Sequence, residues 1–186
     1  MVTGVDMDAP GGAARGSRAP ATDASETHRA RGRYIALDVG RVRIGVARGE
    51  DGVAVADHTL ERAGTRRDLI ALAPLLQSPA PDAVIVGLPP ASDDPRTCSA
   101  RMAREFARRL AESTGLPTWL VDEADSTRAA TERLQALGYS GPRLRERVDA
   151  EAAAVILRRY LDGAEAIAVD PADKPAPLGP AGSGRP

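Results

Sequence analysis

The feature that most constrains the fold of this chain is a short apolar segment that ends in an acidic residue and a glycine. Residues 34–37 (Tyr-Ile-Ala-Leu) are typical of a buried strand, Asp38 closes that strand, and a second apolar run at 44–47 follows Gly40. Burial disfavours the charged form of a carboxylate unless a cation or hydrogen bonds compensate. The pattern therefore predicts two hairpin strands, with Asp38 at a site that binds a cation.

The rest of the central region predicts a mixed α/β fold. Apolar runs of strand length alternate with segments in which apolar residues recur at helical spacing. The expected strands are 33–37, 44–48, 53–60, 83–86 and 118–121, and the expected helices are 65–77, 96–113, 126–137 and 149–161, with a polar basic loop at 139–147. This order predicts a five-stranded mixed sheet, in which an antiparallel meander joins parallel strands and helices flank the whole.

Composition divides the 186 residues into one folded domain between two tails. Residues 1–31 are rich in Gly, Ala, Pro, Asp and Arg without periodicity, which predicts a disordered N-terminal tail. Residues 165–186 are rich in Pro, Ala and Gly and predict a disordered C-terminal tail. Residues 33–163 are then expected to form a single domain of ordinary size that carries the functional site.

Charge and cysteine content narrow the class of protein. The formal net charge is −1, so no overall positive charge marks the chain as a nucleic-acid binder, although a local basic patch is compatible with this value. Cys98 is the only cysteine, which excludes an intrachain disulfide and favours a reducing compartment. No apolar run approaches the roughly 20 residues that span a membrane. We therefore expect a cytoplasmic protein with no membrane partner.

Two further acids lie at the ends of core elements. Glu123 follows the expected strand 118–121, and ligands in open α/β sheets usually bind at such carboxyl ends. Asp149 begins the expected last helix, on the same stripe as Ala152 and Ala153. Each acid alone also fits a structural role, Glu123 beside the dipole of the next helix and Asp149 as a helix cap. Together with Asp38, however, they form a pattern with a clear chemical use.

Three carboxylates at strand and helix ends predict a divalent-metal site. Mg²⁺ and Mn²⁺ prefer carboxylate oxygens. Two such ions about 3.5–4 Å apart can activate water and stabilise the leaving oxygen of a phosphodiester. We therefore take Asp38, Glu123 and Asp149 as candidate catalytic and metal-binding residues of a two-metal site.

Arginines near these acids are the candidate nucleic-acid contacts. Arg41 and Arg43 flank the first acid in the chain, and Arg143, Arg145 and Arg147 precede the last. Arginine beside a metal site could hold a phosphate backbone over the ions. A second stripe, formed by Arg101, Arg104 and Arg108, also fits a solvated helix face. No aromatic platform for single-stranded bases is visible.

Four segments, taken in order, resemble the YqgF/RuvX family, whose members are described as Holliday junction resolvases or pre-16S rRNA nucleases. The family pattern Asp-x-Gly-x-x-Arg-Ile-Gly-Val-Ala matches residues 38–47, and Val-Gly-Leu-Pro matches 86–89. Asp-Glu at a strand end matches 122–123, and Asp-x-x-Ala-Ala matches 149–153. The resemblance covers about residues 33–162, which is nearly the whole expected domain.

The resemblance implies an RNase H-like fold and a metal-dependent nuclease. It carries Asp38, Glu123 and Asp149 over as metal-binding catalytic acids. The implied substrates are the 5′ end of pre-16S rRNA in ribosome biogenesis or, alternatively, a branched DNA junction in recombination and repair. The chain departs from the family directly after Glu123, where the family has Arg-Leu and this chain has Ala124-Asp125. That change puts one arginine contact in doubt and adds a negative charge.

Two other classes remain open from sequence. An actin-like phosphotransferase also places an acid and glycines on a hairpin, but it needs two such lobes and this chain has room for one. A nucleic-acid-binding module without catalysis would keep the arginines and lose the chemistry. The sequence does not distinguish RNA from DNA, Mg²⁺ from Mn²⁺, or a monomer from a homodimer.

Overall fold

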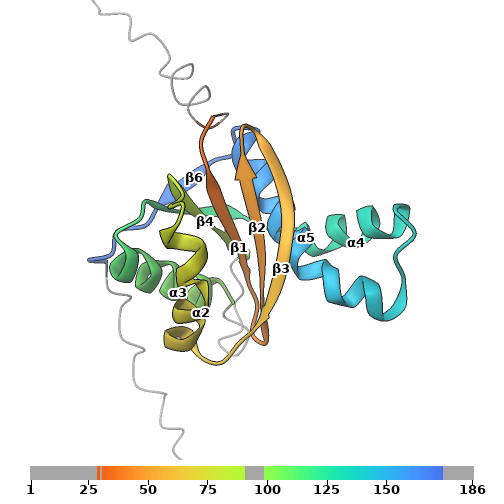
Figure 1. Cartoon of the computed structure of the whole chain (residues 1–186), viewed down its shortest axis with the longest axis horizontal. Coiled ribbons are helices and arrows are strands. Elements are labelled where there is room, and N and C mark those ends of the chain that lie inside the picture. Colours follow the sequence, from red (N-terminus) through yellow and green to blue (C-terminus); the bar gives the residue numbers. More distant parts are fainter. Residues whose placement is uncertain (1–28, 30, 91–98, 174–186) are drawn as a thin grey trace, which may run out of the picture.

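The structure is a computed structural model that describes residue 29, residues 31–90 and residues 99–173. Within these residues one mixed sheet has the strand order β3-β2-β1-β4-β5-β6, with helices on both of its faces (Figure 1). The expected α/β class with a mixed sheet is confirmed. None of the helices described is both long and apolar enough to cross a bilayer. Cys98 and most of the two expected tails lie outside the described residues.

The elements follow the expected order with shifted ends. The strands are β1 (Tyr34–Val39), β2 (Arg43–Glu50), β3 (Val53–Glu61), β4 (Ala83–Leu88), β5 (Thr118–Asp122) and β6 (Ala166–Ala168). The helices are α2 (Thr65–Gln77), α3 (Ser99–Thr114), α4 (Ser126–Ala136) and α5 (Gly141–Leu161). Strands β1, β2 and β3 pair antiparallel, whereas β1, β4 and β5 pair parallel. The meander joined to parallel strands is therefore present as expected.

One face of the sheet is covered by α2 and α3 (Figure 1). Their buried side chains are large, and they meet the inward side chains of β1, β2 and β4 in one apolar cluster. The fully buried members include Leu37, Val86, Leu72, Phe106 and Leu110. This face is an ordinary core, in which each large side chain contributes on the order of 1.5–3 kcal/mol by burial.

The opposite face is covered by α5, and its packing is much closer. Three successive alanines of α5 are fully buried, and the sheet beneath carries glycines where the helix crosses it. A Cβ at Gly45 would clash with the backbone carbonyl of Asp149. A Cβ at Gly49 would lie 2.9 Å from Leu157 Cδ2. Small residues on both sides thus let the backbone of α5 come close to the strands.

The last helix begins earlier than its sequence predicts. Residues 141–147, expected within a polar basic loop, form the first turns of α5, so Asp149 lies inside the helix and is not its cap. The Gly-Pro pair suggested a loop, but Pro142 occupies the first turn, where a missing N–H costs nothing. This first part of α5 packs on α4, and both extend beyond the sheet on the side of β3 (Figure 1).

The sheet has six strands rather than the five expected. Residues 166–168, expected in a disordered tail, form β6 and pair antiparallel with β5. The segment is only three residues long and rich in alanine, so it gives little strand signal. Arg29, likewise expected in a tail, donates hydrogen bonds to the carbonyls of Tyr160 and Ala164.

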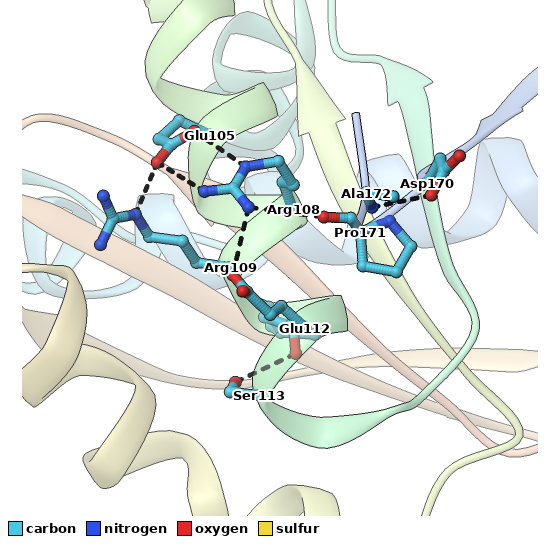
Figure 2. A network of polar contacts seen from close by, with 9 residues as sticks. Glu105, Arg108, Arg109, Glu112, Ser113, Asp170, Pro171 and Ala172 are labelled. Carbon is cyan, nitrogen blue, oxygen red and sulfur yellow. Dashed lines mark hydrogen bonds and ion pairs between the residues drawn. The ribbon is translucent and has the colours of Figure 1, made fainter. Parts of the chain in front are cut away.

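An arginine of α3 fastens the chain that follows β6 (Figure 2). Arg108 donates to Glu105 at 3.1 Å, to Glu112 at 3.1 Å and to the carbonyl of Pro171 at 3.5 Å. Hydrogen bonds from Arg108 and Arg109 lower the pKa of Glu105 to about 2. Because Arg108 is engaged in this network, this member of the arginine stripe on α3 has a structural role on the face away from the three acids.

Candidate active site

Strand alternation places the first acid on the face that α5 covers. Tyr34 and Ala36 of β1 pack against α5, and Asp38 follows them at the same two-residue spacing. Asp38 lies at the carboxyl end of β1, and its partner across the antiparallel pair is Gly45 of β2. Asp38 therefore points toward the face that α5 covers, opposite a position without a side chain.

The second acid lies one residue beyond β5, over a glycine of β4. The N–H of Glu123 donates to the carbonyl of Leu88 at 3.1 Å, which continues the pairing of β4 with β5. A Cβ at Gly87 would clash with Glu123 Oε2 and would lie 2.7 Å from Ile156 Cδ1. The glycine of the Val-Gly-Leu-Pro segment thus makes the space that the Glu123 side chain occupies.

The third acid comes from α5. Asp149 sits where the backbone of α5 contacts Gly45, which is also the partner of Asp38. Arg43 Nε lies 2.7 Å from Asp149 Oδ2, and the side chain of Arg43 is 42% exposed. The guanidinium does not make a hydrogen bond of good geometry to that oxygen, which has no hydrogen-bond partner. Asp149 therefore lies beside a positive charge, but its Oδ2 atom accepts no hydrogen bond.

The three carboxylates perturb one another. Burial and then the charge of Asp149 raise the pKa of Asp38 to about 6. Burial, then Asp38 and Asp122, raise the pKa of Glu123 to about 8, against a lowering influence of Arg159. Burial also raises the pKa of Asp149, although Arg43 opposes the shift. Asp38 thus interacts with both other acids, and carboxyl groups that favour protonation mark a place suited to a cation.

The donor set fits a hard divalent cation, but the oxygens do not yet surround one point. Glu123 Oε2 and Asp149 Oδ2 are buried without hydrogen-bond partners, and carboxylate oxygens are the ligands that Mg²⁺ and Mn²⁺ prefer. In the part of the chain described, no three His, Cys, Asp or Glu side chains form a ready metal cluster. The three expected acids therefore lie toward one face of the sheet, within electrostatic reach of a neighbour. Their side chains would have to rotate for all three to bind one ion.

Arg62, which the sequence did not single out, braces the turn next to Asp38. Its side chain is 11% exposed and donates to Asp68 at 2.9 Å and to the carbonyl of Gly40 at 3.1 Å. Its backbone N–H donates to the carbonyl of Val42 at 2.8 Å. Arg62 thus ties the β1–β2 turn to α2. No local sequence pattern distinguishes it from the many surface arginines.

The five predicted nucleic-acid contacts lie in two groups. Arg41 is exposed in the β1–β2 turn, and Arg43 reaches Asp149. On α5, Arg145 is one helical turn before Asp149 and shares its stripe. Arg143 and Arg147 are four residues apart on a different face of α5, and the guanidinium of Arg147 lies 4.9 Å from the ring centre of Tyr139. The three α5 arginines thus do not form a single row.

The fold and the acidic edge of the sheet define an RNase H-like α/β protein. The structure of Thermus thermophilus RuvC in complex with a Holliday junction substrate superposes with a TM-score of 0.51 and covers 73% of this chain and 99% of that one. The sequence identity is 16%, so this likeness concerns the fold alone.

The chain belongs to the RuvX family. The family model, described as "Holliday junction resolvase", matches residues 32–163. A protein of Anaeromyxobacter sp. (strain Fw109-5), named "Putative pre-16S rRNA nuclease", is 46% identical over 136 residues, which are 72% of this chain and 99% of the relative. A protein of the same name from Methylobacillus flagellatus is 36% identical over 135 residues, covering 72% and 92%.

Proposed function

We propose that this protein is a divalent-metal-dependent nuclease that hydrolyses phosphodiester bonds through Asp38, Glu123 and Asp149. The observation that carries the proposal is the pair of buried oxygens of Glu123 and Asp149 that lack hydrogen-bond partners beside Asp38. An uncompensated buried carboxylate costs stability, so two buried carboxylate oxygens without hydrogen bonds, next to a third acid, favour a site for a cation. Membership of the RuvX family supports a nuclease in the same direction.

Each acid has a defined part in this chemistry. Bound Mg²⁺ or Mn²⁺ would activate the attacking water and stabilise the leaving oxygen. Asp38, on the central strand β1, would bind the ions between Glu123 on one side and Asp149 on the other. All three must lose their protons to bind a cation, which their raised pKa values make harder at low pH. Arg43 must release Asp149 at least in part, and its exposed side chain is free to turn toward a phosphate.

The substrate proposed first is the 5′ end of pre-16S rRNA, in the cytoplasm, because the most similar relatives described above carry that name. The alternative is a branched DNA junction, which the family description favours. A shallow recess of 330 Å³, lined by Pro90 and residues 123–127, lies beside Glu123. Arg41 in the β1–β2 turn, Arg43 on β2 and Arg145 on α5 lie near Asp38 or Asp149 in the fold, so a polyanion could cross the site over them.

A cleavage panel tests this proposal. Purified protein is incubated with a pre-16S 5′ segment, single-stranded RNA and a four-way DNA junction, each with Mg²⁺, Mn²⁺ or a chelator. Cleavage of the pre-16S segment that stops in chelator supports the first substrate, and preferential cutting of the junction supports the second. Binding without cleavage under every condition would identify a binding module, and ATP binding without cleavage would favour the phosphotransferase relationship.

The oligomeric state separates the two substrates further. Symmetric resolution of a junction needs two active sites, and hence a homodimer, whereas trimming of one RNA strand needs a single site. Sedimentation of the protein alone and with each substrate measures this directly. A monomer that remains monomeric on four-way DNA would count against junction resolution and leave RNA processing as the function.

A further inference from the structure

Arg159 of α5 binds the backbone on both sides of Glu123. One guanidinium nitrogen donates to the carbonyl of Asp122 at 2.9 Å, and the other donates to the carbonyl of Ala124 at 2.6 Å. The residue enclosed between these two carbonyls is the candidate catalytic acid. A planar fork with fixed N–H directions suits two carbonyls at once, which a single ammonium group does not. The contact is therefore specific for arginine.

The rest of this turn is held by the chain's own hydrogen bonds. The N–H of Glu123 donates to Leu88, and the carbonyl of Glu123 accepts from Ser126 at 2.9 Å. The N–H of Ala124 donates to the Asp122 side chain at 3.0 Å. Arg159 supplies the hydrogen bonds to the carbonyls of Asp122 and Ala124, so its loss would release one side of the turn and leave the other in place.

The neighbouring arginine shows that this is not a general property of the helix end. Arg158 lies next to Arg159 on α5 but pairs with Glu151 at 3.0 Å, within the same helix. The two residues have the same charge and similar exposure, and only Arg159 reaches the turn that contains Glu123.

We propose that Arg159 is a positioning residue that fixes the Glu123 carboxylate over Gly87 by holding the carbonyls of Asp122 and Ala124. The inference rests on the proposed function, because it takes Glu123 as an active-site acid. Asp149 and Arg159 lie on one continuous helix, so the same element places one acid directly and the other through this clamp. The family pattern has an arginine at position 124, where this chain has alanine. Arg159 brings a guanidinium from α5 to the backbone of that residue.

The test compares Arg159→Ala and Arg159→Lys with Arg158→Ala, which removes the same charge from the adjacent position. Three quantities are measured for each variant: kcat on the substrate that wild type cleaves, Kd for that substrate in chelator, and amide hydrogen exchange at Glu123 and Ser126. For Arg159→Ala we expect kcat to fall about 10- to 100-fold, since small displacements of a catalytic group have effects of this order. Substrate Kd should stay within about twofold, because the clamp acts on catalysis.

Amide exchange in the turn gives a readout that does not need activity. The amides of Glu123 and Ser126 should exchange at least about tenfold faster in Arg159→Ala and remain near wild type in Arg158→Ala. Arg159→Lys should resemble Arg159→Ala, and full recovery by lysine would show that charge alone suffices and overturn the clamp. Equal kcat in Arg159→Ala and Arg158→Ala, or a rise in Kd as large as the fall in kcat, would also overturn it. If wild type cleaves nothing, the proposed function fails, and unchanged exchange in Arg159→Ala would then refute the clamp separately.

Discussion

The two faces of the sheet are built by different rules. The face under α2 and α3 is filled by large side chains such as Leu72, Phe106 and Leu110. The face under α5 combines large side chains such as Ile85, Ile156 and Leu157 with alanines and glycines where the helix crosses the strands, and the three acids lie at its edge. Large side chains keep a helix at a distance and bury apolar area, whereas small ones let a helix backbone approach the strands. Both faces are therefore apolar cores, and only the one under α5 also brings the backbone of Asp149 next to Gly45, the strand partner of Asp38.

The face under α2 and α3 carries none of the three acids, so its residues are expected to contribute to stability alone. Burial raises the pKa of Asp38 and of Glu123, and the charges of Asp149 and Asp38 respectively raise them further, which marks a local cost in folding free energy when the acids are charged. The face under α2 and α3 has no such cost, and its apolar burial can offset the cost at the acids. Substitutions under α2 and α3 should therefore lower stability and leave cleavage unchanged, whereas substitutions of the acids should lower cleavage.

The largest effect should come from the acids. Asp38→Asn, Glu123→Gln and Asp149→Asn are each expected to reduce cleavage at least about 1,000-fold, equivalent to about 4 kcal/mol of transition-state stabilisation, because each would remove a charged ligand of the proposed metal site. Initial rates measured with the folded variants, checked by circular dichroism, provide the test. Wild-type rates in all three variants would show that the site lies elsewhere.

The next effect should appear on the apolar face and in stability alone. Leu110 is fully buried against the sheet, so Leu110→Ala should cost about 2–5 kcal/mol of unfolding free energy through lost contacts and a cavity. Cleavage per folded molecule should stay within about twofold of wild type, since the acids lie on the other face. Urea titration and kcat at low temperature measure the two quantities. A large fall in kcat would contradict the separation of the faces.

A smaller effect is expected at Gly87. The added Cβ of Gly87→Ala meets the ends of two side chains, Glu123 and Ile156, which can move aside. Stability should therefore change by less than about 1.5 kcal/mol, while displacement of Glu123 lowers kcat about 100-fold. Gly49→Ala is the matched control, since its Cβ meets only Leu157 on the same face, away from the acids. Equal kcat in the two variants would refute the placement of Glu123.

The pH dependence of stability gives a signed test of burial at Asp38. Its pKa rises from 3.8 to about 6 on folding, so the folded state holds this proton more tightly than the unfolded state. The contribution of Asp38 is therefore most favourable below pH about 4 and is lost as pH rises toward 6. In chelator, Asp38→Asn should be more stable than wild type at pH 8 by on the order of 1–3 kcal/mol, with no difference near pH 4. A difference independent of pH would exclude this explanation.

The smallest effect should be on substrate binding by Arg145, which lies one helical turn before Asp149 on α5. Arg145→Ala is expected to weaken binding several-fold, about 1 kcal/mol, and to lower the slope of log Kd against log salt by about one. Arg109→Ala is the control, because Arg109 pairs with Glu105 on α3, on the opposite face. Fluorescence anisotropy over a salt series in chelator measures both. The same slope in both variants would remove Arg145 from the substrate path.

The strands and the position of two acids follow from sequence because both depend on local patterns. Period-two spacing puts Asp38 on the same face as Ala36, and the strand end at Asp122 sets Glu123 at the carboxyl edge. The start of α5 was missed because a glycine followed by Pro142 is also typical of a loop. The strand β6 was missed because its three residues gain their structure from β5, and not from their own propensity.

The supporting arginines could not be predicted because their roles depend on long-range packing. Arg159 reaches Asp122 only because α5 crosses the sheet at the angle that its alanines and the strand glycines permit. Arg62 reaches the β1–β2 turn from the far end of β3. Both are single members of an arginine-rich sequence, and neither has a neighbour that marks it. The family motifs include the three acids but not Arg62 or Arg159, which bind the backbone near Asp38 and beside Glu123.

The contact of Gly45 with the backbone of Asp149 sets a fixed gap inside the molecule. The carbonyl of Asp149 occupies the volume that any side chain at position 45 would need. Strand β2, which pairs with the strand of Asp38, and the main chain of Asp149 are therefore already at their closest approach, whatever rotamers the carboxylates adopt. Replacing either acid by glutamate would lengthen a side chain by one methylene without widening this gap. The distance between the Asp149 backbone and β2 is thus set by Gly45 and not by the length of the acidic side chains.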